Sequence, residues 1–378
     1  MKGARRPARG FTLIELMVAL VVSSLLVGMI LAIFSRMSIA YRGQQQIAGV
    51  QQVLAAARAT IELDAKQTGL GLSQGFVLAD NKLYPPVLIT NNNAGPDKVV
   101  FFYADPSSQA AVKLPFAWGS SMTVDDTSTF LADQLVVVSS VDLTQSGLNP
   151  ATDGNIAKYS ACVLRIQSLT ANTLQFYTSL PFGTPGESHC SAVLPTPSAT
   201  TMVYKFVAHG YQIDPTRPAL GALQLSPTGG LIATDWKDLA YGFTDIQTAL
   251  QVYHTVSTTV PPAGDTPDLD VDPVRDWYSD GVQDNLTAPT GSAGPPVLAP
   301  PNGLLQISIS LVARTDREVE GIASSQTPPL VDLLNVANNT IGDRPSVPLP
   351  SADPALVGSR IFRYTTFQVD FRNLGVGR

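Results

Sequence analysis

Charged residues are scarce in this sequence of 378 residues: Lys, Arg, Asp and Glu make up 14% of it, against roughly 25% in ordinary soluble domains. Hydrophobic residues make up 44%, so part of the chain is unusually apolar or unusually rich in uncharged polar residues. Four of the 24 basic residues lie in the first ten positions, which leaves 20 basic against 30 acidic residues, or −10, in the rest of the chain. No nucleic-acid partner is therefore expected.

Cysteine is rarer still, with Cys162 and Cys190 alone in the whole sequence. Two cysteines exclude a disulfide-dense scaffold and a four-cysteine zinc site. Glycine and proline, 29 each, fall short of the roughly 25–30% that is typical of low-complexity disorder. Most of the chain is therefore expected to fold, and it is long enough to bury one large core or two small ones.

One region is almost free of charge. Residues 11–34 are 24 consecutive residues whose only charge is Glu15, and Arg36 follows them. A helix of that length is about 36 Å long, which is enough to cross a bilayer. Because positive flanks stay on the cytoplasmic side, residues 1–10 should face the cytoplasm and everything after Arg36 should lie outside it.

Two general interpretations of this segment each leave a feature unexplained. A cleaved secretory signal has an apolar stretch of roughly 7–15 residues before a small-residue cleavage site. Residues 38–40 could form such a site, but the apolar run before them is too long. A plain signal anchor explains the length, but it does not explain a carboxylate at the fifth position of the run.

The residues Arg-Gly-Phe-Thr-Leu-Ile-Glu at positions 9–15 resemble the prepilin processing site of type IV pilins and of type II secretion pseudopilins. In that family a membrane peptidase cuts after the glycine, here Gly10, and methylates the new terminal amine, here that of Phe11. A carboxylate near the centre of a membrane costs about 2.5–3.5 kcal/mol and needs a partner. The resemblance implies that Glu15 pairs with the Phe11 amine of an adjacent subunit and so sets the register between subunits.

After the apolar run the sequence becomes amphipathic. Apolar residues recur at spacings of three and four, at Ile47, Val50, Leu54, Ala57 and Ile61. We therefore predict one helix of roughly 55 residues, with a transmembrane segment at 11–34 and an amphipathic continuation at 35–66. Gly69, Gly71 and Gly75 are expected to end it.

Residues 71–75 fit the G-x-S-x-G nucleophile elbow of hydrolases. That elbow must follow a strand and open a helix, whereas this sequence follows a predicted helix and opens a loop. The histidines that could act as its base number only three, at His189, His209 and His254. We therefore predict that the chain is not an enzyme.

Residues 67–378 are predicted to form a periplasmic or extracellular β-rich head. Short strands are expected at 99–103, 135–141, 162–166, 174–178 and 202–207. Alternation at 305–311 and 367–371 predicts half-buried antiparallel strands. Segments rich in Pro, Ser and Gly at 285–303 and 343–358 are typical of loops. The predicted class is α+β and type IV pilin-like, with a long N-terminal helix packed on an antiparallel head.

Looser matches in the head favour one particular family of type IV pilins. Residues 235–253, 304–314 and 360–373, in this order behind a long prepilin helix, look like the PilW family of minor pilins. A J-type minor pseudopilin of type II secretion, or a tip adhesin pilin, remains an alternative. The resemblance implies an inner-membrane precursor that is assembled into a pilus fibre, at its tip. The implied partners are prepilin peptidase, other minor and major pilins, and the pilus assembly platform.

Two sets of residues outside the helix are candidate sites. In an oxidising compartment Cys162 and Cys190 are expected to form a disulfide, which would stabilise the fold by roughly 3–4 kcal/mol. An acidic run begins like a calcium loop, at Asp268, Asp270, Asp272 and Asp276. It then departs from that pattern, because Pro273 and Ser279 stand where the turn glycine and the bidentate glutamate should be. A solvated acidic loop is the favoured interpretation, an irregular calcium site is the alternative, and no other cofactor is expected.

Overall fold

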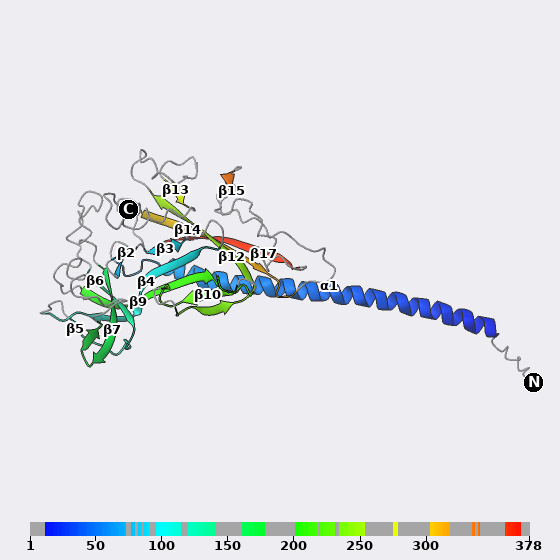
Figure 1. Cartoon of the computed structure of the whole chain (residues 1–378), viewed down its shortest axis with the longest axis horizontal. Coiled ribbons are helices and arrows are strands. Elements are labelled where there is room, and N and C mark those ends of the chain that lie inside the picture. Colours follow the sequence, from blue (N-terminus) through cyan, green and yellow to red (C-terminus); the bar gives the residue numbers. More distant parts are fainter. Residues whose placement is uncertain are drawn as a thin grey trace, which may run out of the picture.

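The computed structural model describes fifteen segments of the chain. These are residues 12–72, 77–79, 82–84, 86–90, 96–114, 120–140, 161–177, 201–217, 220–230, 234–253, 275–278, 303–317, 335–336, 339–340 and 360–371. Within them one long helix, α1, leads into a head built of strands (Figure 1). The predicted α+β class, a long N-terminal helix on an antiparallel β-rich head, is confirmed.

Helix α1 is continuous from Leu13 to Gln67, 55 residues. Thr68 caps its C-terminal end, and Gly69 and Gly71 follow with φ of 77° and 67°, a region that residues with a side chain rarely adopt. A Cβ on Gly71 would lie 2.7 Å from the Cβ of Ala104. Gly69 and Gly71 therefore end the helix as predicted, and Gly71 also lets the chain pass close to the strand that contains Ala104. Gly75 lies outside the described residues.

The larger sheet has eleven strands, and its main path runs β11-β10-β9-β6-β7-β1-β2. Off this path β4 pairs with β9, β3 with β4, β8 with β7 and β5 with β8; every pairing is antiparallel except that of β1 with β7. The bounds are β1 Val77–Ala79, β2 Lys82–Tyr84, β3 Val87–Thr90, β4 Lys98–Ala111, β5 Ser121–Thr123, β6 Leu135–Ser140, β7 Ala161–Thr170, β8 Thr173–Phe176, β9 Thr201–Ile213, β10 Leu223–Ser226 and β11 Lys237–Ala240.

A second, antiparallel sheet has the order β13-β12-β14-β17. Its strands are β12 Phe243–Tyr253, β13 Arg275–Tyr278, β14 Gly303–Arg314 and β17 Phe362–Asp370. A separate pair consists of β15 Asn335–Val336 and β16 Asn339–Thr340. Of the two predicted loops, Gly303 belongs to β14, and the remainder of 285–303 and all of 343–358 lie outside the described residues.

The two C-terminal strands differ in burial. In β17 Phe367 and Val369 are buried while Gln368 and Asp370 are exposed, as the alternation predicts. The prediction of a half-buried strand is wrong for β14, where Ser308 and Ser310 are fully buried although they lie opposite the apolar face. Serine side chains are small enough to be covered on this face. The Ser310 hydroxyl lies 2.7 Å from the hydroxyl of Thr366 on β17, whereas the Ser308 hydroxyl has no hydrogen-bond partner among the described residues.

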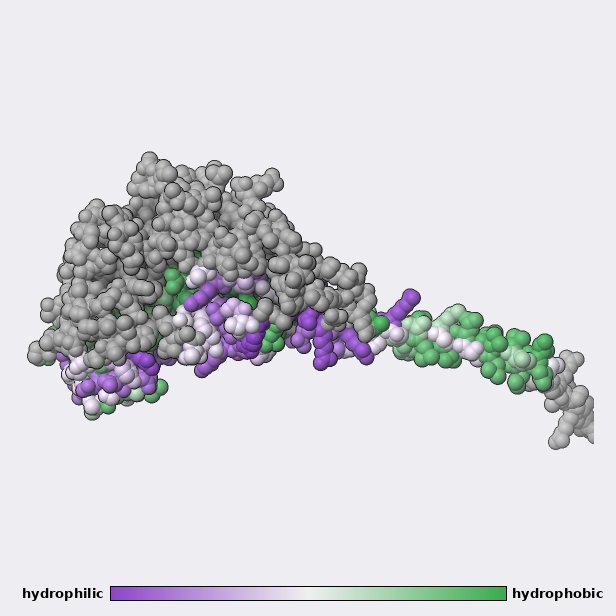
Figure 2. Space-filling model, viewed as in Figure 1, coloured by the Kyte–Doolittle hydropathy of each residue, from purple (hydrophilic) through white to green (hydrophobic). Residues whose placement is uncertain are grey.

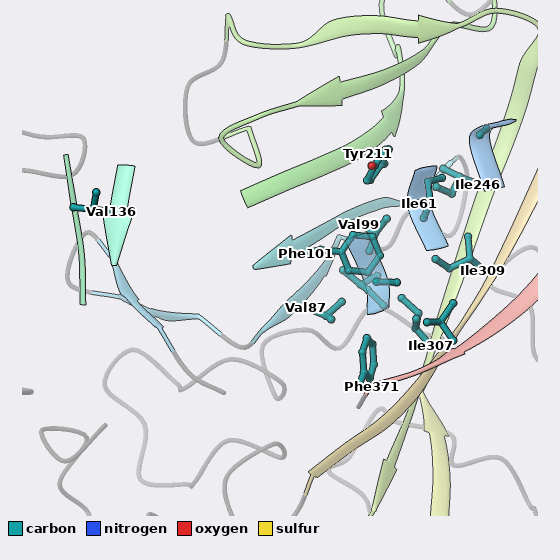
Figure 3. Packing of buried hydrophobic residues seen from close by; sticks show 14 of the residues in the cluster. Ile61, Val87, Val99, Phe101, Val136, Tyr211, Ile246, Ile307, Ile309 and Phe371 are labelled. Carbon is teal, nitrogen blue, oxygen red and sulfur yellow. The ribbon is translucent and has the colours of Figure 1, made fainter. Parts of the chain in front are cut away.

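The second half of α1 lies in the main hydrophobic core. Ile61 is fully buried and lies among Phe101 of β4, Tyr211 of β9, and Ile246 and Ile309 of the second sheet (Figure 3). Val50, Leu54 and Ala57 belong to the same core, so the predicted apolar face of the helix is confirmed for four of its five residues, and Ile47 is half-buried. The helix therefore joins the two sheets through a shared core.

We predict that Ile61→Ala lowers the free energy of unfolding by about 2–5 kcal/mol, because it leaves a cavity where helix and both sheets meet. Leu63, two residues away on the same helix and 58% exposed, is the matched control. Leu63→Ala should change the free energy by no more than about 0.5 kcal/mol. Chemical denaturation of the full chain in detergent measures both, and equal losses would show that α1 is not packed as described.

Candidate assembly helix and its anchor in the head

The first half of α1 is apolar and uncovered. From Leu13 to Met37 all 17 large hydrophobic side chains are exposed, at 52–78% of their surface. The helix contains an 18-residue window of mean hydropathy 2.8 of which none is buried, so it is long and apolar enough to cross a membrane. Figure 2 shows this half as a green rod that extends beyond the head. We call residues 13–37 the apolar half of α1.

The start of the helix is held by a capping box between Thr12 and Glu15. The Thr12 hydroxyl accepts from the Glu15 backbone N–H at 3.4 Å, and the Glu15 carboxylate accepts from the Thr12 backbone N–H at 3.0 Å. The same carboxylate oxygen accepts from the Thr12 hydroxyl at 3.0 Å. Gly10 and Phe11 lie outside the described residues, so the pairing of Glu15 with the Phe11 amine stays a prediction. The Thr-x-x-Glu spacing of this box is a sequence signal from which it could have been predicted.

A buried carboxylate holds the other end of the helix to the head. Asp64, 5% exposed, accepts a hydrogen bond from the Tyr103 hydroxyl of β4 at 2.9 Å and another from the Tyr211 hydroxyl of β9. Nδ1 of His209, also on β9, lies 2.8 Å from Oδ2 of Asp64, the same oxygen that accepts from Tyr211, while Tyr103 donates to Oδ1. We call these four residues the Asp64 cluster. It joins the last turns of α1 to the two longest strands of the larger sheet.

The surroundings of Asp64 explain why a charge is tolerated there. Two phenols and an imidazole surround the carboxylate, so both of its oxygens have hydrogen-bond partners although they are buried. Burial, and then the negative charge of Asp64, raise the pKa of both Tyr103 and Tyr211 far above the ordinary range of a phenol. Both tyrosines are therefore held as protonated donors, which is the form that the carboxylate requires.

The Asp64 cluster was not predicted from the sequence. Asp64 stands three residues after Ile61, on the continuation of the predicted apolar face, and a charge at such a position is a signal that could have been noticed. Its partners, however, are 39, 145 and 147 residues away. Neither their distance in sequence nor their residue types point to Asp64.

The second sheet holds the helix on another side, through Arg58. Its guanidinium lies 5.2 Å from the ring centroid of Phe367 on β17 and 3.3 Å from Glu62, one turn further along α1. Glu62 also pairs with Lys66 at 2.7 Å. These charges are partly exposed, so each pair contributes at most about 1 kcal/mol, and the buried Asp64 is the stronger polar anchor.

The other predicted site residues are only partly described. Cys162 is buried on β7 and is not a free thiol, whereas Cys190 lies outside the described residues, so their pairing stays a prediction. Asp268, Asp270 and Asp272 lie outside the described residues, and Asp276 lies on β13, where its side chain is not described. Among the residues that the structure describes, no group of three or more His, Cys, Asp or Glu is arranged to hold a metal ion.

Comparison with known proteins identifies the N-terminal segment. Residues 5–31 match the family model of the prokaryotic N-terminal methylation motif, so the chain carries that motif. Among solved structures, a type IV-like pilin from Thermus thermophilus is similar, with 11% sequence identity and a TM-score of 0.33 over 86% of this chain and 97% of that one. That TM-score is too low to define a shared fold. No curated protein matches the sequence.

We predict that Asp64→Asn lowers the free energy of unfolding by about 2–4 kcal/mol, because the amide removes the charge and turns an N–H₂ donor toward groups that are themselves donors. Glu62→Gln is the matched control, since it neutralises a carboxylate two residues away that is partly exposed. It should cost at most about 1 kcal/mol. Denaturation of both variants in detergent provides the comparison, and a loss no larger for Asp64→Asn than for the control would contradict the anchor.

The raised pKa values of Tyr103 and Tyr211 predict a loss of stability at alkaline pH. The folded chain keeps these phenol protons to higher pH than the unfolded chain does, so their contribution is complete below about pH 10, the ordinary phenol pKa, and is lost as pH rises above it. Unfolding free energies measured at a series of pH values should therefore fall steeply above that point. The slope should be shallower for Tyr103→Phe/Tyr211→Phe, and equal slopes would overturn this explanation.

Proposed function

We propose that this chain is a minor pilin of a type IV pilus. In this proposal it is made as a precursor with one membrane-spanning helix in the inner membrane, and prepilin peptidase trims it after Gly10 and methylates Phe11. It then enters the fibre through α1. The observation that carries the proposal is the uncovered apolar half of α1, because it begins within a prokaryotic N-terminal methylation motif.

The apolar half has two environments in which its surface is removed from water. Before assembly this environment is the hydrocarbon layer of the membrane, which the helix is long enough to cross. After assembly it is the packed helices of neighbouring pilins. Both environments are apolar, so the same side chains serve in each and the helix can pass from one to the other without unfolding.

Within residues 13–34 Glu15 is the one charge, and it has to be satisfied in both environments. In the precursor its carboxylate closes the capping box with Thr12. Cleavage after Gly10 creates a cationic amine on Phe11, and in the fibre we propose that the carboxylate pairs with the amine of an adjacent subunit. A charge pair within an apolar bundle is strong and depends on position, so it would fix the register between subunits.

The head is proposed to lie in the periplasm before assembly and on the outside of the fibre, at its tip, afterwards. Its PilW-like character rests on the resemblance of residues 235–253, 304–314 and 360–373. The other proposed partners are minor and major pilins and the assembly platform. We propose no enzymatic activity and no cofactor, and a disulfide between Cys162 and Cys190 that stabilises the head.

We predict that Glu15→Ala leaves expression, membrane insertion and cleavage intact but strongly reduces the amount of the protein in sheared fibres. The reason is that the Phe11 amine of the neighbouring subunit loses the carboxylate with which it pairs. Fractionation and immunoblotting of sheared fibres and membranes measure this. If the variant enters fibres at the wild-type level, the pair is dispensable.

Thr12→Val is the matched control for this experiment. It removes the hydroxyl that makes two of the three capping contacts but leaves the Glu15 carboxylate in place. If Glu15 acts through a neighbouring subunit, Thr12→Val should assemble nearly normally. If it acts only by capping its own helix, the two variants should fail to the same degree.

A further inference from the structure

We propose that Arg36 and Arg42 of α1, which lie about 120° apart around the helix, bind anionic phospholipid headgroups at the outer face of the membrane. The proposal rests on the proposed function, in that α1 must span the membrane. We call these two residues the arginine pair. The proposal commits to lipid phosphates, and an acidic surface on a neighbouring subunit is an outcome of the test.

Neither arginine has a partner among the described parts of the chain. Both side chains are exposed, and neither forms an ion pair with any residue that the structure describes. The sequence has no acidic residue from position 16 to position 61. Pairing within the helix needs an acidic residue three or four positions away, so it is excluded for both arginines.

The positions of the two arginines along the helix axis place them near the lipid headgroups. Leu13 to Phe34 spans about 32 Å, close to the roughly 30 Å thickness of the hydrocarbon layer. The headgroup layer adds about 5–7 Å on each side. The backbone of Arg36 lies about 3 Å beyond Phe34, inside that layer, and that of Arg42 lies about 12 Å beyond it.

The direction of helical side chains brings Arg42 back toward the membrane. Side chains in an α-helix lean toward its N-terminus, which is here the membrane end. A long arginine side chain can therefore run along the helix and place its guanidinium near the phosphates. The planar guanidinium donates two parallel hydrogen bonds to a phosphate, which makes arginine well suited to this ligand.

The head begins directly above the arginine pair. Gly43 is the first buried residue of α1, one position after Arg42. The arginine pair thus lies where the apolar half of the helix ends and the head begins, and Figure 2 shows hydrophilic residues following the green rod. The arginine pair would therefore fix the depth of the helix and keep the head close to the membrane before assembly.

The test uses the full precursor reconstituted in phosphatidylcholine vesicles that contain a minor fraction of phosphatidylglycerol. Spin-labelled analogues of the two lipids report which of them contacts the helix. A basic residue near an anionic surface contributes about fivefold to association, so we expect phosphatidylglycerol to be enriched about fivefold or more over phosphatidylcholine. The enrichment should shrink at about 1 M salt, where the Debye length is about 3 Å.

The variants distinguish lipid binding by the arginine pair from a general effect of the protein's positive charge. The comparison is made in a chain whose leader residues Lys2, Arg5, Arg6 and Arg9 are all replaced by Gln, so that they bind no headgroup at the opposite face. In that chain Arg36→Gln/Arg42→Gln should abolish the enrichment, whereas Arg36→Lys/Arg42→Lys should retain most of it. Lys113→Gln/Lys237→Gln is the matched control, because it removes two exposed positive charges from the head. It should leave the enrichment unchanged.

Each remaining outcome decides against the proposal. If the wild-type protein is inserted but shows no lipid preference, the arginine pair does not bind lipid, although the proposed function stands. If Arg36→Gln/Arg42→Gln keeps the preference but fails to enter fibres, the arginines bind a neighbouring subunit instead. Protein that alkaline extraction releases from the vesicles would refute the membrane-spanning helix itself, and with it the proposed function.

Discussion

The apolar half of α1 cannot remain in water, and the rest of the structure depends on this constraint. Its 17 large side chains are more than half exposed, and burying a side chain of this kind is worth about 1.5–3 kcal/mol, so their transfer out of water amounts to tens of kcal/mol. No part of the head that the structure describes covers them. The chain is therefore built to complete its apolar surface with lipid or with other helices.

The second half of the same helix meets the opposite requirement, since it must stay attached to the head. Its apolar face lies in a core shared by both sheets, and Asp64 adds a polar contact that apolar packing alone would not provide. A buried carboxylate is weak evidence for added stability, but its hydrogen bonds to tyrosines on two different strands restrict where its oxygens can lie. We interpret the Asp64 cluster as the contact that fixes the rotation of α1 against β4 and β9, so that the head follows any movement of the helix.

Local periodicity made much of the fold predictable. The run whose only charge is Glu15, the apolar face ending at Ile61 and the following glycines predicted one helix whose length agrees with the observed 55 residues. The strand predicted at 135–141 is observed at Leu135–Ser140. What could not be predicted depends on contacts across the sequence: the parallel pairing of β1 with β7, the burial of Ser308 and Ser310, and the partners of Asp64. Each of these three features depends on contacts between residues that are far apart in the sequence, and the pattern of neighbouring residues does not reveal such contacts.

The most direct test of the account is the chemical identity of the mature N-terminus, because the proposed function requires cleavage after Gly10 to convert a membrane anchor into a subunit that enters a fibre. Mass spectrometry of the N-terminal peptide from membranes and from sheared fibres measures it. The account predicts a peptide that begins at N-methylated Phe11 in both fractions and an uncleaved precursor, absent from fibres, in Gly10→Val. A mature chain that begins after Ala40, with the apolar half of α1 removed, would contradict it.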